Sequence, residues 1–188
     1  NEVDYISIFS DSYTTIEGSD YNPNWGQQTG YNLFDLNGDE MLQYSTLNYQ
    51  GINIGETIDV TAMEYLHVDI WTPALVSVDI YPLQVGVPAE DEKFKTLDLV
   101  EGEWSSFDIP LSFFTDQGLA IDQIHQFKFV GENSGTIFVD NLYFWRQETA
   151  VVQALIYDDF EGNGNIDTWA GDDCGMDNNL PNPCIDIN

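Results

Sequence analysis

Short runs of alternating apolar and polar residues constrain this sequence more than any other feature. The runs are rich in Val, Ile, Tyr and Phe, and Gly, Asn, Asp and Pro separate them, which is typical of β-strands joined by tight turns. The expected strands cover residues 4–10, 30–35, 41–49, 51–54, 65–72, 77–85, 94–98, 105–110, 125–130 and 136–145. Only residues 111–118 and 119–123 could form a helical turn. We therefore expect an all-β protein, a two-sheet antiparallel β-sandwich of jelly-roll type.

Acidic residues dominate the charge of the chain. Thirty-three Asp and Glu residues stand against four basic ones, Lys93, Lys95, Lys128 and Arg146, and the formal net charge is -29. This balance excludes binding to a nucleic-acid backbone, which needs Lys and Arg to neutralise phosphates, and it argues against docking on anionic membranes. A hydrophobic fraction of 43% is too high for a disordered acidic tail. Mutual repulsion should weaken the fold unless salt or divalent cations such as calcium relieve it.

The composition changes after residue 147. We expect a β-sandwich module over residues 1–147, a linker over 148–155, and over 156–188 either the truncated start of a second module or an irregular C-terminal extension. Cys174 and Cys184 both lie in this last part, where a disulfide and two free thiols remain open alternatives. The first residue is Asn1, and no run of 18 apolar residues occurs, so we expect a processed or excised start and no membrane insertion.

Alternation within three expected strands sorts side chains onto two faces. Leu66, Val68 and Ile70 should face the core, and the outward side chains are those of His67, Asp69, Trp71, Asp79, Tyr81, Gln126 and Lys128. A mixture of flat aromatic rings with hydrogen-bonding groups suits sugars, whose C–H faces stack on rings while hydroxyls bind polar groups. The alternative is an ordinary polar outer face, with Lys128 paired to Asp69 or Asp79.

Two loops offer further candidates. Trp25 lies between Asn, Pro and Gly residues and is followed by Gln27, so its ring should be displayed on a turn. Tyr49 and Gln50 have similar chemistry. These side chains would either bind a sugar ring or form a lid over one end of the core.

Carboxylates near the first and last expected strands suggest a metal site. Asp11 ends the first strand and Asp140 lies in the last, and such strands often pair, so a hard cation such as calcium could bind between them. The alternative is hydrogen bonding at strand ends. Residues 35–40 and 159–164 do not complete an EF-hand pattern. His67 and His125 are predicted on opposite faces, and the nucleophile, phosphate-loop and zinc motifs do not occur, so we expect no enzymatic activity.

Several motifs together resemble a known family. They are residues 8–13 (Ile-Phe-Ser-Asp-Ser-Tyr), 22–27 (Asn-Pro-Asn-Trp-Gly-Gln), 47–51 (Leu-Asn-Tyr-Gln-Gly), 65–72 (Tyr-Leu-His-Val-Asp-Ile-Trp-Thr), 125–129 (His-Gln-Phe-Lys-Phe) and 139–144 (Val-Asp-Asn-Leu-Tyr-Phe). The stretch 5–146 resembles the non-catalytic β-sandwich carbohydrate-binding modules of secreted bacterial glycanases and surface glycan-binding proteins. Residues 155–183 resemble the start of another such module. The resemblance implies an extracellular or cell-surface protein, a multimodular parent chain and a structural calcium near the terminal strands.

These observations predict a binding protein without chemistry of its own. It would hold a polysaccharide, for instance a β-glucan such as laminarin, near a degrading enzyme or uptake machinery. The predicted contact residues are Trp25, Gln27, Tyr49, Gln50, His67, Asp69, Trp71, Tyr81, Gln126 and Lys128. The alternatives are a calcium-stabilised structural or adhesion domain of a large surface protein and, third, a glycanase or lyase.

Overall fold

A computed structural model describes residues 4–147, without the side chains of residues 133 and 134. The predictions for the linker 148–155, for residues 156–188 and for the pair Cys174 and Cys184 lie outside the described residues. Within residues 4–147, no helix is long and apolar enough to span a membrane.

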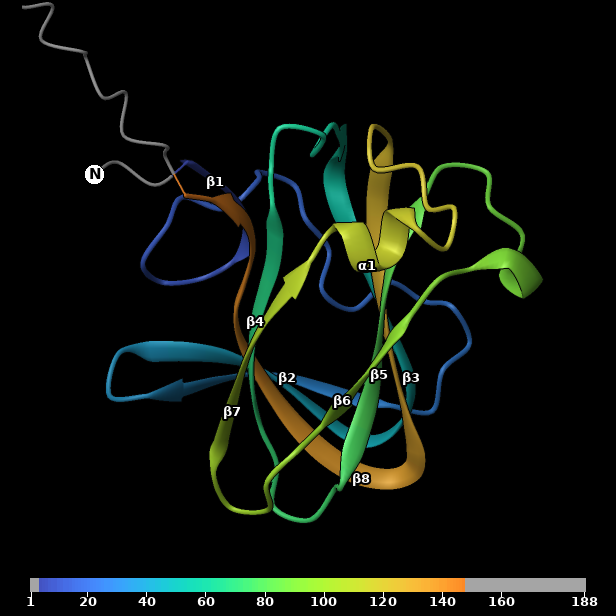
Figure 1. Ribbon diagram of the computed structural model, residues 1–188. Coiled ribbons are helices and arrows are strands. Elements are labelled where there is room, and N and C mark those ends of the chain that lie inside the picture. Colours follow the sequence, from blue (N-terminus) through green and yellow to red (C-terminus); the bar gives the residue numbers. More distant parts are fainter. Residues whose placement is uncertain (1–3, 148–188) are drawn as a thin grey trace, which may run out of the picture. The chain divides into compact units, whose positions relative to one another are not determined.

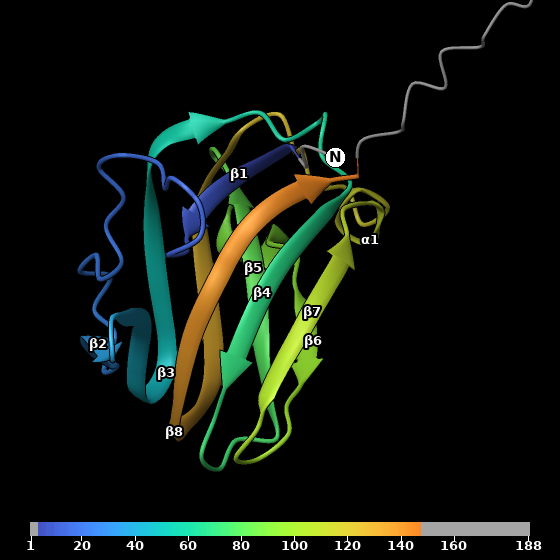
Figure 2. The same cartoon turned by 90° about the vertical axis from the view of Figure 1, so that its left-hand side faces the viewer.

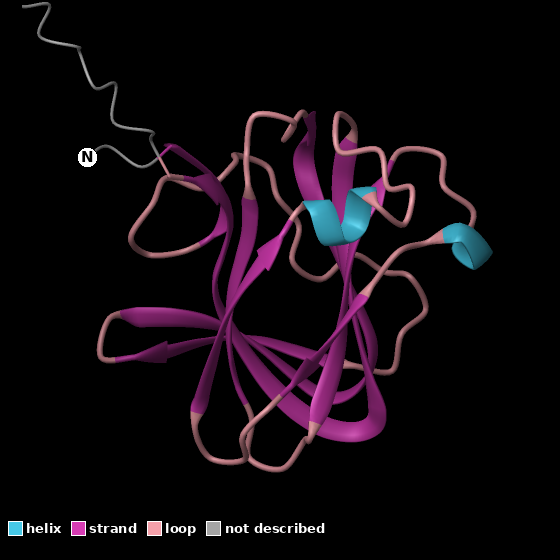
Figure 3. Cartoon of the chain, viewed as in Figure 1, coloured by secondary structure: helices cyan, strands magenta, loops and turns pink. Residues whose placement is uncertain are grey.

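The described part of the chain is built almost entirely of β-strands (Figures 1 and 3), which confirms the predicted fold class. The strands are β1 (Asp4–Phe9), β2 (Gly30–Leu36), β3 (Asp39–Ile58), β4 (Tyr65–Trp71), β5 (Ser77–Gln84), β6 (Lys95–Asp98), β7 (Trp104–Pro110) and β8 (Ile124–Arg146). Two short helical segments complete the fold, the 3-10 turn η1 (Ala89–Asp91) and α1 (Ser112–Thr115).

The two longest strands, β3 and β8, differ from the prediction, because each was expected to be two separate strands. They pair antiparallel along one continuous ladder, from Ile58 opposite Ile124 to Leu42 opposite Val139. The ladder bends in the middle, where Thr46 has a φ of 53° and the register shifts. Figure 2 shows β8 curving through this bend. A Cβ at Gly135 would lie 2.1 Å from Leu75 Cγ, so the packing of Leu75 near the bend leaves no room for a side chain at residue 135.

The bend divides the strands into two antiparallel sheets. The first sheet has the order β2, β3, β8, β4 and β7, with β1 paired to β8 beyond the end of β3. The second sheet has the other half of β3, the first half of β8, then β5 and β6. Among these strands, β2 and β7 are the ends of the first order and β6 is an end of the second, and the strands shared by both orders curve the sheets toward a closed barrel.

The core lies between the two sheets. Leu66, Val68 and Ile70 of β4 are completely buried, as alternation predicted, and so are Phe127 and Phe129 of β8. Burial of such side chains stabilises the fold through the hydrophobic effect. The predicted helical turn near residue 111 is α1, whose Phe114 is buried against this core.

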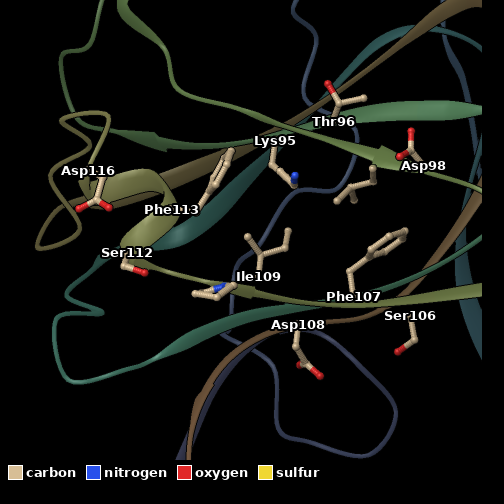
Figure 4. Close-up of a pocket in the computed structure, with 12 residues that line it drawn as sticks. Lys95, Thr96, Asp98, Ser106, Phe107, Asp108, Ile109, Ser112, Phe113 and Asp116 are labelled. Carbon is tan, nitrogen blue, oxygen red and sulfur yellow. The ribbon is translucent and has the colours of Figure 1, made fainter.

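The seam between β6 and β7 contains a hollow with a volume of about 620 Å³ (Figure 4). Lys95 Nζ lies 4.9 Å from the ring centre of Phe113 at this seam. Phe107 and Ile109 line it from the side that faces the core. None of the predicted contact residues lines this hollow, so it marks incomplete closure of the sheets.

Candidate functional site

The predicted outward residues do not share one surface. His67, Asp69 and Trp71 lie on β4, which pairs with the second half of β8. Tyr81, Gln126 and Lys128 lie where β5 pairs with the first half of β8. Because the bend in β8 carries these halves into different sheets, the single surface predicted from alternation was wrong.

One surface gathers five of the predicted residues. We call it the Trp25 surface, and it consists of Trp25, Tyr49, Tyr81, Gln126 and Lys128 on the outer side of the second sheet. A hollow of about 540 Å³ lies beside Trp25, Tyr49 and Lys128 and is lined by Trp25, Asn48, Tyr49, Glu92, Lys128, Val130 and Gly131. The strands β3 and β8 and the loop before β2 thus bring together residues that are about 100 positions apart in the sequence.

The loop that carries Trp25 is held by its own side chains. The Tyr49 hydroxyl donates to the Trp25 carbonyl oxygen at 2.8 Å, and the Trp25 amide donates to Gln27 Oε1 at 2.8 Å. Gln27 Nε2 donates in turn to the Pro23 carbonyl oxygen at 2.8 Å. Gln27 therefore shapes the loop, and its predicted contact with a sugar remains a prediction.

The indole of Trp25 lies directly against the backbone of β3. A Cβ at Gly51 would approach within 2.5 Å of Trp25 Cε3 and Cζ3, so the ring fits only because residue 51 is glycine. Trp25 is half-buried and also lines the hollow. The backbone thus fixes a large aromatic ring at the edge of an open depression.

Lys128 lies over the middle of the surface. Its Nζ is 4.1 Å from the ring centre of Tyr81, and it forms an ion pair with Glu92, next to η1. Tyr81 also stacks on Phe94 at 4.9 Å. Burial, together with the nearby charges of Asp79 and Glu92, raises the pKa of Tyr81. The alternative that pairs Lys128 with Asp69 or Asp79 was wrong, because the partner is Glu92. Asp79 instead accepts a hydrogen bond from Thr96 Oγ1 at 2.6 Å.

The two glutamines of this region have different positions. Gln126 is half-buried on the outer side, and its Nε2 donates to Asn53 Oδ1 at 2.8 Å. Gln50 is completely buried and donates to the carbonyl oxygens of Gly51 at 2.9 Å and Tyr21 at 3.3 Å. The prediction that Gln50 contacts a ligand was wrong, because alternation from the outward Tyr49 turns residue 50 inward.

His67 and Asp69 form a hydrogen-bonded cluster on the first sheet. His67 Nδ1 lies 2.8 Å from Asp108 Oδ1, its Nε2 lies 3.4 Å from Asp69 Oδ1, and its ring stacks on Tyr143 at 4.6 Å. Burial lowers the pKa of His67, but the two carboxylates outweigh burial and raise it. Burial raises the pKa of Asp69, whereas hydrogen bonds from His67, Ser106 and Asn141 lower it overall.

Asp11 and Asp140 are brought near each other, as the pairing of β1 with β8 predicted. Asp140 is 9% exposed, and burial is the main reason that its pKa rises to about 6, with further contributions from the charges of Asp39, Asp11 and Asp69. Asp11 Oδ2 accepts from the Glu40 amide at 2.9 Å. Within residues 4–147, no three His, Cys, Asp or Glu side chains form a group that could hold a metal ion. Calcium binding therefore remains a prediction.

Sequence reasoning missed Glu92, Asn48 and Asn53. The only signal for Glu92 was indirect, because a single Lys within a strand of so acidic a chain needs an acidic partner. Asn48 precedes Tyr49 in a motif that the sequence analysis did single out, and its Oδ1 accepts from the Gln28 amide at 3.0 Å. The partner of Gln126, Asn53, is 73 residues away in the sequence and follows only from the register of β3 with β8.

Comparison with known proteins identifies the fold. A family 11 carbohydrate-binding module from Clostridium thermocellum, in complex with a β-1,3-1,4-mixed-linked tetrasaccharide, matches with a TM-score of 0.53 and 16% identity over 77% of this chain and 96% of that chain. A variant of a family 29 module complexed with mannohexaose has a TM-score of 0.51 and 13% identity over 77% and 93% of the two chains. The chain has the β-sandwich fold of these modules.

A third solved structure, another family 29 module, has a TM-score of 0.51 and 14% identity over 77% of this chain and 90% of that chain. No protein-family model matches the sequence, and no curated protein matches it either.

Proposed function

We propose that this protein is a non-catalytic module that binds a neutral polysaccharide on the Trp25 surface. The observation that carries the proposal is the Trp25 ring, which rests on Gly51 and lines an open hollow beside Tyr49 and Lys128. A sugar ring can stack on such an indole, because its C–H groups carry partial positive charge that the face of the aromatic ring attracts.

The polar residues around the hollow suit the hydroxyls of a sugar. Asn48 and Gln126 each offer an amide, and Lys128 and Glu92 offer a donor and an acceptor that are already paired with each other. The net charge of -29 opposes the approach of an anionic glycan. We therefore propose a neutral ligand, with a β-glucan such as laminarin as the first choice.

Related folds support this ligand class without naming one sugar. The module from Clostridium thermocellum was solved with a mixed-linked β-glucan tetrasaccharide, and the family 29 variant with mannohexaose. Both ligands are neutral oligosaccharides. We also propose an extracellular or cell-surface setting within a multimodular chain, where tandem modules would gain affinity through effective concentration.

Affinity gel electrophoresis tests the proposal, with laminarin, mixed-linkage β-glucan and glucomannan each cast in a native gel. We expect retardation of the wild-type protein by at least one glycan and clearly weaker retardation of the Trp25→Ala variant. Phe113→Ala is the matched control, since Phe113 is an exposed aromatic residue outside the hollow. Equal melting temperatures must accompany the loss. Unchanged retardation of Trp25→Ala would contradict the proposed surface.

A second candidate is a calcium-stabilised structural or adhesion domain, which is favoured by Asp140, because burial and, after it, the charges of Asp39, Asp11 and Asp69 raise its pKa. Asp11 and Asp140 would supply oxygen ligands, which calcium prefers. This candidate requires a melting temperature that rises with calcium and not with magnesium at equal ionic strength, together with no retardation by any glycan.

A further inference from the structure

A continuous row of apolar side chains crosses the outer face of the first sheet. It contains Phe34 and Leu36 of β2, Met41 of β3, Phe138 of β8, Trp71 of β4 and Trp104 of β7, which together line a hollow of about 260 Å³. The strand register aligns them, since Phe34 lies opposite Met41, and Trp71 lies opposite both Phe138 and Trp104. We call these six residues the Trp71 row.

The ends of the row are accessible to solvent, whereas Met41 is buried, with an exposed fraction of 4%. Trp104 is 47% exposed and Leu36 is 53% exposed, at opposite ends of the row. In the middle, the ring of Phe138 makes edge contacts with Phe34 at 5.3 Å and with Trp71 at 5.4 Å. A contiguous apolar surface that crosses a sheet face is a candidate interaction site.

A polar row runs beside the Trp71 row on the same face. Two residues from a member of the row lie Asn32 on β2, Gln43 on β3, Asp69 on β4 and Ser106 on β7, whereas Asp140, at this position on β8, is buried. Asn32 lies opposite Gln43, to which its Nδ2 donates at 3.2 Å, and Asp69 lies opposite Ser106. Residues two apart on a strand are about 7 Å apart, so Phe34, Met41, Trp71 and Trp104 each have a polar neighbour at about this distance.

The paired rows match the two sides of a sugar unit. Aromatic rings can contact its C–H face, and amide, hydroxyl and carboxylate groups can bind the hydroxyls at its rim. The Trp71 row crosses five neighbouring strands, β2, β3, β8, β4 and β7, and therefore extends over about 19 Å at the usual strand spacing. That length is sufficient for a chain of several sugar units.

The charges around the row restrict the ligand. Asp35 and Glu40 flank it on the β2–β3 hairpin, and Glu101 and Glu103 flank it before β7; all four are exposed. These carboxylates repel an anionic glycan and a second copy of this acidic chain. A neutral polysaccharide satisfies the apolar row, the polar row and the acidic rim.

We infer that the Trp71 row and its polar neighbours form a second binding surface for a neutral polysaccharide. The two surfaces lie on the outer faces of different sheets, so one molecule can hold two polysaccharide chains and link them. The inference depends on the proposed function only for the class of ligand, because it uses different residues.

The number of binding sites on each protein molecule tests the inference. It is measured by isothermal titration calorimetry, in which an oligosaccharide of a glycan that retards the protein in gels is titrated into the protein. We expect two sites in the wild-type protein, one in Trp25→Ala, one in Trp104→Ala and none in the double variant. Leu36→Ser provides a second change in the row and should weaken the same site at least threefold. Phe113→Ala is the control and should keep both sites.

The outcomes separate the inference from the proposed function. One site in the wild-type protein, lost in Trp25→Ala and unchanged in Trp104→Ala and Leu36→Ser, overturns the second surface and leaves the proposed function intact. Loss in Trp104→Ala with no effect of Trp25→Ala overturns the proposed surface and supports the inference. A wild-type dimer in analytical ultracentrifugation that Trp104→Ala converts to a monomer overturns the inference, because the row would then bind a second copy.

Discussion

At the scale of single residues, Gly51 controls the position of Trp25. A methyl group at residue 51 would lie 2.5 Å from the indole, so Gly51→Ala must displace the ring from the strand. We expect glycan affinity to fall about tenfold, equal to about 1.4 kcal/mol. Titration of the variant by calorimetry would measure this loss, with Phe113→Ala as the control, since Phe113 lies outside the hollow. Wild-type affinity in Gly51→Ala would show that stacking on Trp25 does not hold the ligand.

The ion pair between Lys128 and Glu92 predicts a strong dependence of stability on both partners. Their side chains are only 18% and 12% exposed, so removing one leaves the other charge poorly solvated. Lys128→Met should lower the free energy of unfolding by about 2 kcal/mol, and Lys128→Met combined with Glu92→Gln should recover most of the loss. Urea denaturation of the single and double variants measures both the loss in the free energy of unfolding and its recovery. Additive losses would mean that the pair is not coupled.

Asp140 predicts a dependence of stability on pH. Its pKa is about 6 in the folded protein and about 3.9 in an unfolded chain, so its contribution to stability is present below pH 4 and is lost as the pH rises through 6. Asp140→Asn should therefore be more stable than the wild-type protein at pH 7.5 by about 1 to 3 kcal/mol, and equally stable near pH 4.

Denaturation at both pH values without divalent cations tests this prediction, with Asp122→Asn at an exposed turn as the control. Repeating the measurement with calcium addresses the metal prediction. If Asp140 binds calcium, the wild-type protein gains stability on its addition and Asp140→Asn does not. A less stable Asp140→Asn at pH 7.5 without calcium would contradict the raised pKa.

At the scale of strands, the bend of the β3–β8 ladder depends on close packing at Gly135. Its missing side chain leaves room for Leu75, whose Cγ would otherwise lie 2.1 Å from a Cβ. Gly135→Ala should lower the free energy of unfolding by about 1 to 3 kcal/mol through overpacking. The double variant Gly135→Ala/Leu75→Ala tests this cause. Leu75→Ala should reduce the free energy of unfolding less in the Gly135→Ala background than it does in the wild-type protein. Thermal unfolding measures all three variants.

The same bend explains which parts of the structure the sequence could predict. Alternation is a local property, so it correctly placed Leu66, Val68 and Phe127 in the core. Alternation breaks near Gly131 and Gly135. Two structures would give this same sequence pattern: a turn between two strands, and one strand that passes from one sheet to the other. The sequence therefore could not show that His67 and Tyr81 belong to different sheets. It also could not identify Glu92 as the partner of Lys128, because that contact depends on the tertiary fold.

At the scale of the whole molecule, the net charge of -29 sets the response to salt. Arg146 pairs with Asp4 and Lys128 with Glu92, so two of the four basic residues are already used. Most carboxylates must remain without a cationic partner and repel one another, and screening weakens this repulsion as the Debye length falls from about 30 Å at 0.01 M salt to about 3 Å at 1 M. The melting temperature should rise by several degrees between these concentrations of sodium chloride.

Binding of a neutral polysaccharide should respond differently, because it pairs no charges and releases no counterions. Glycan affinity should change less than twofold over the range of salt in which the melting temperature rises, and an anionic polysaccharide should not retard the protein at low salt. Scanning calorimetry and affinity gels at matched salt concentrations measure the two responses. A glycan affinity that falls steeply with salt would show that Lys128 or the acidic rim binds charged groups, which would contradict a ligand held by stacking and neutral hydrogen bonds.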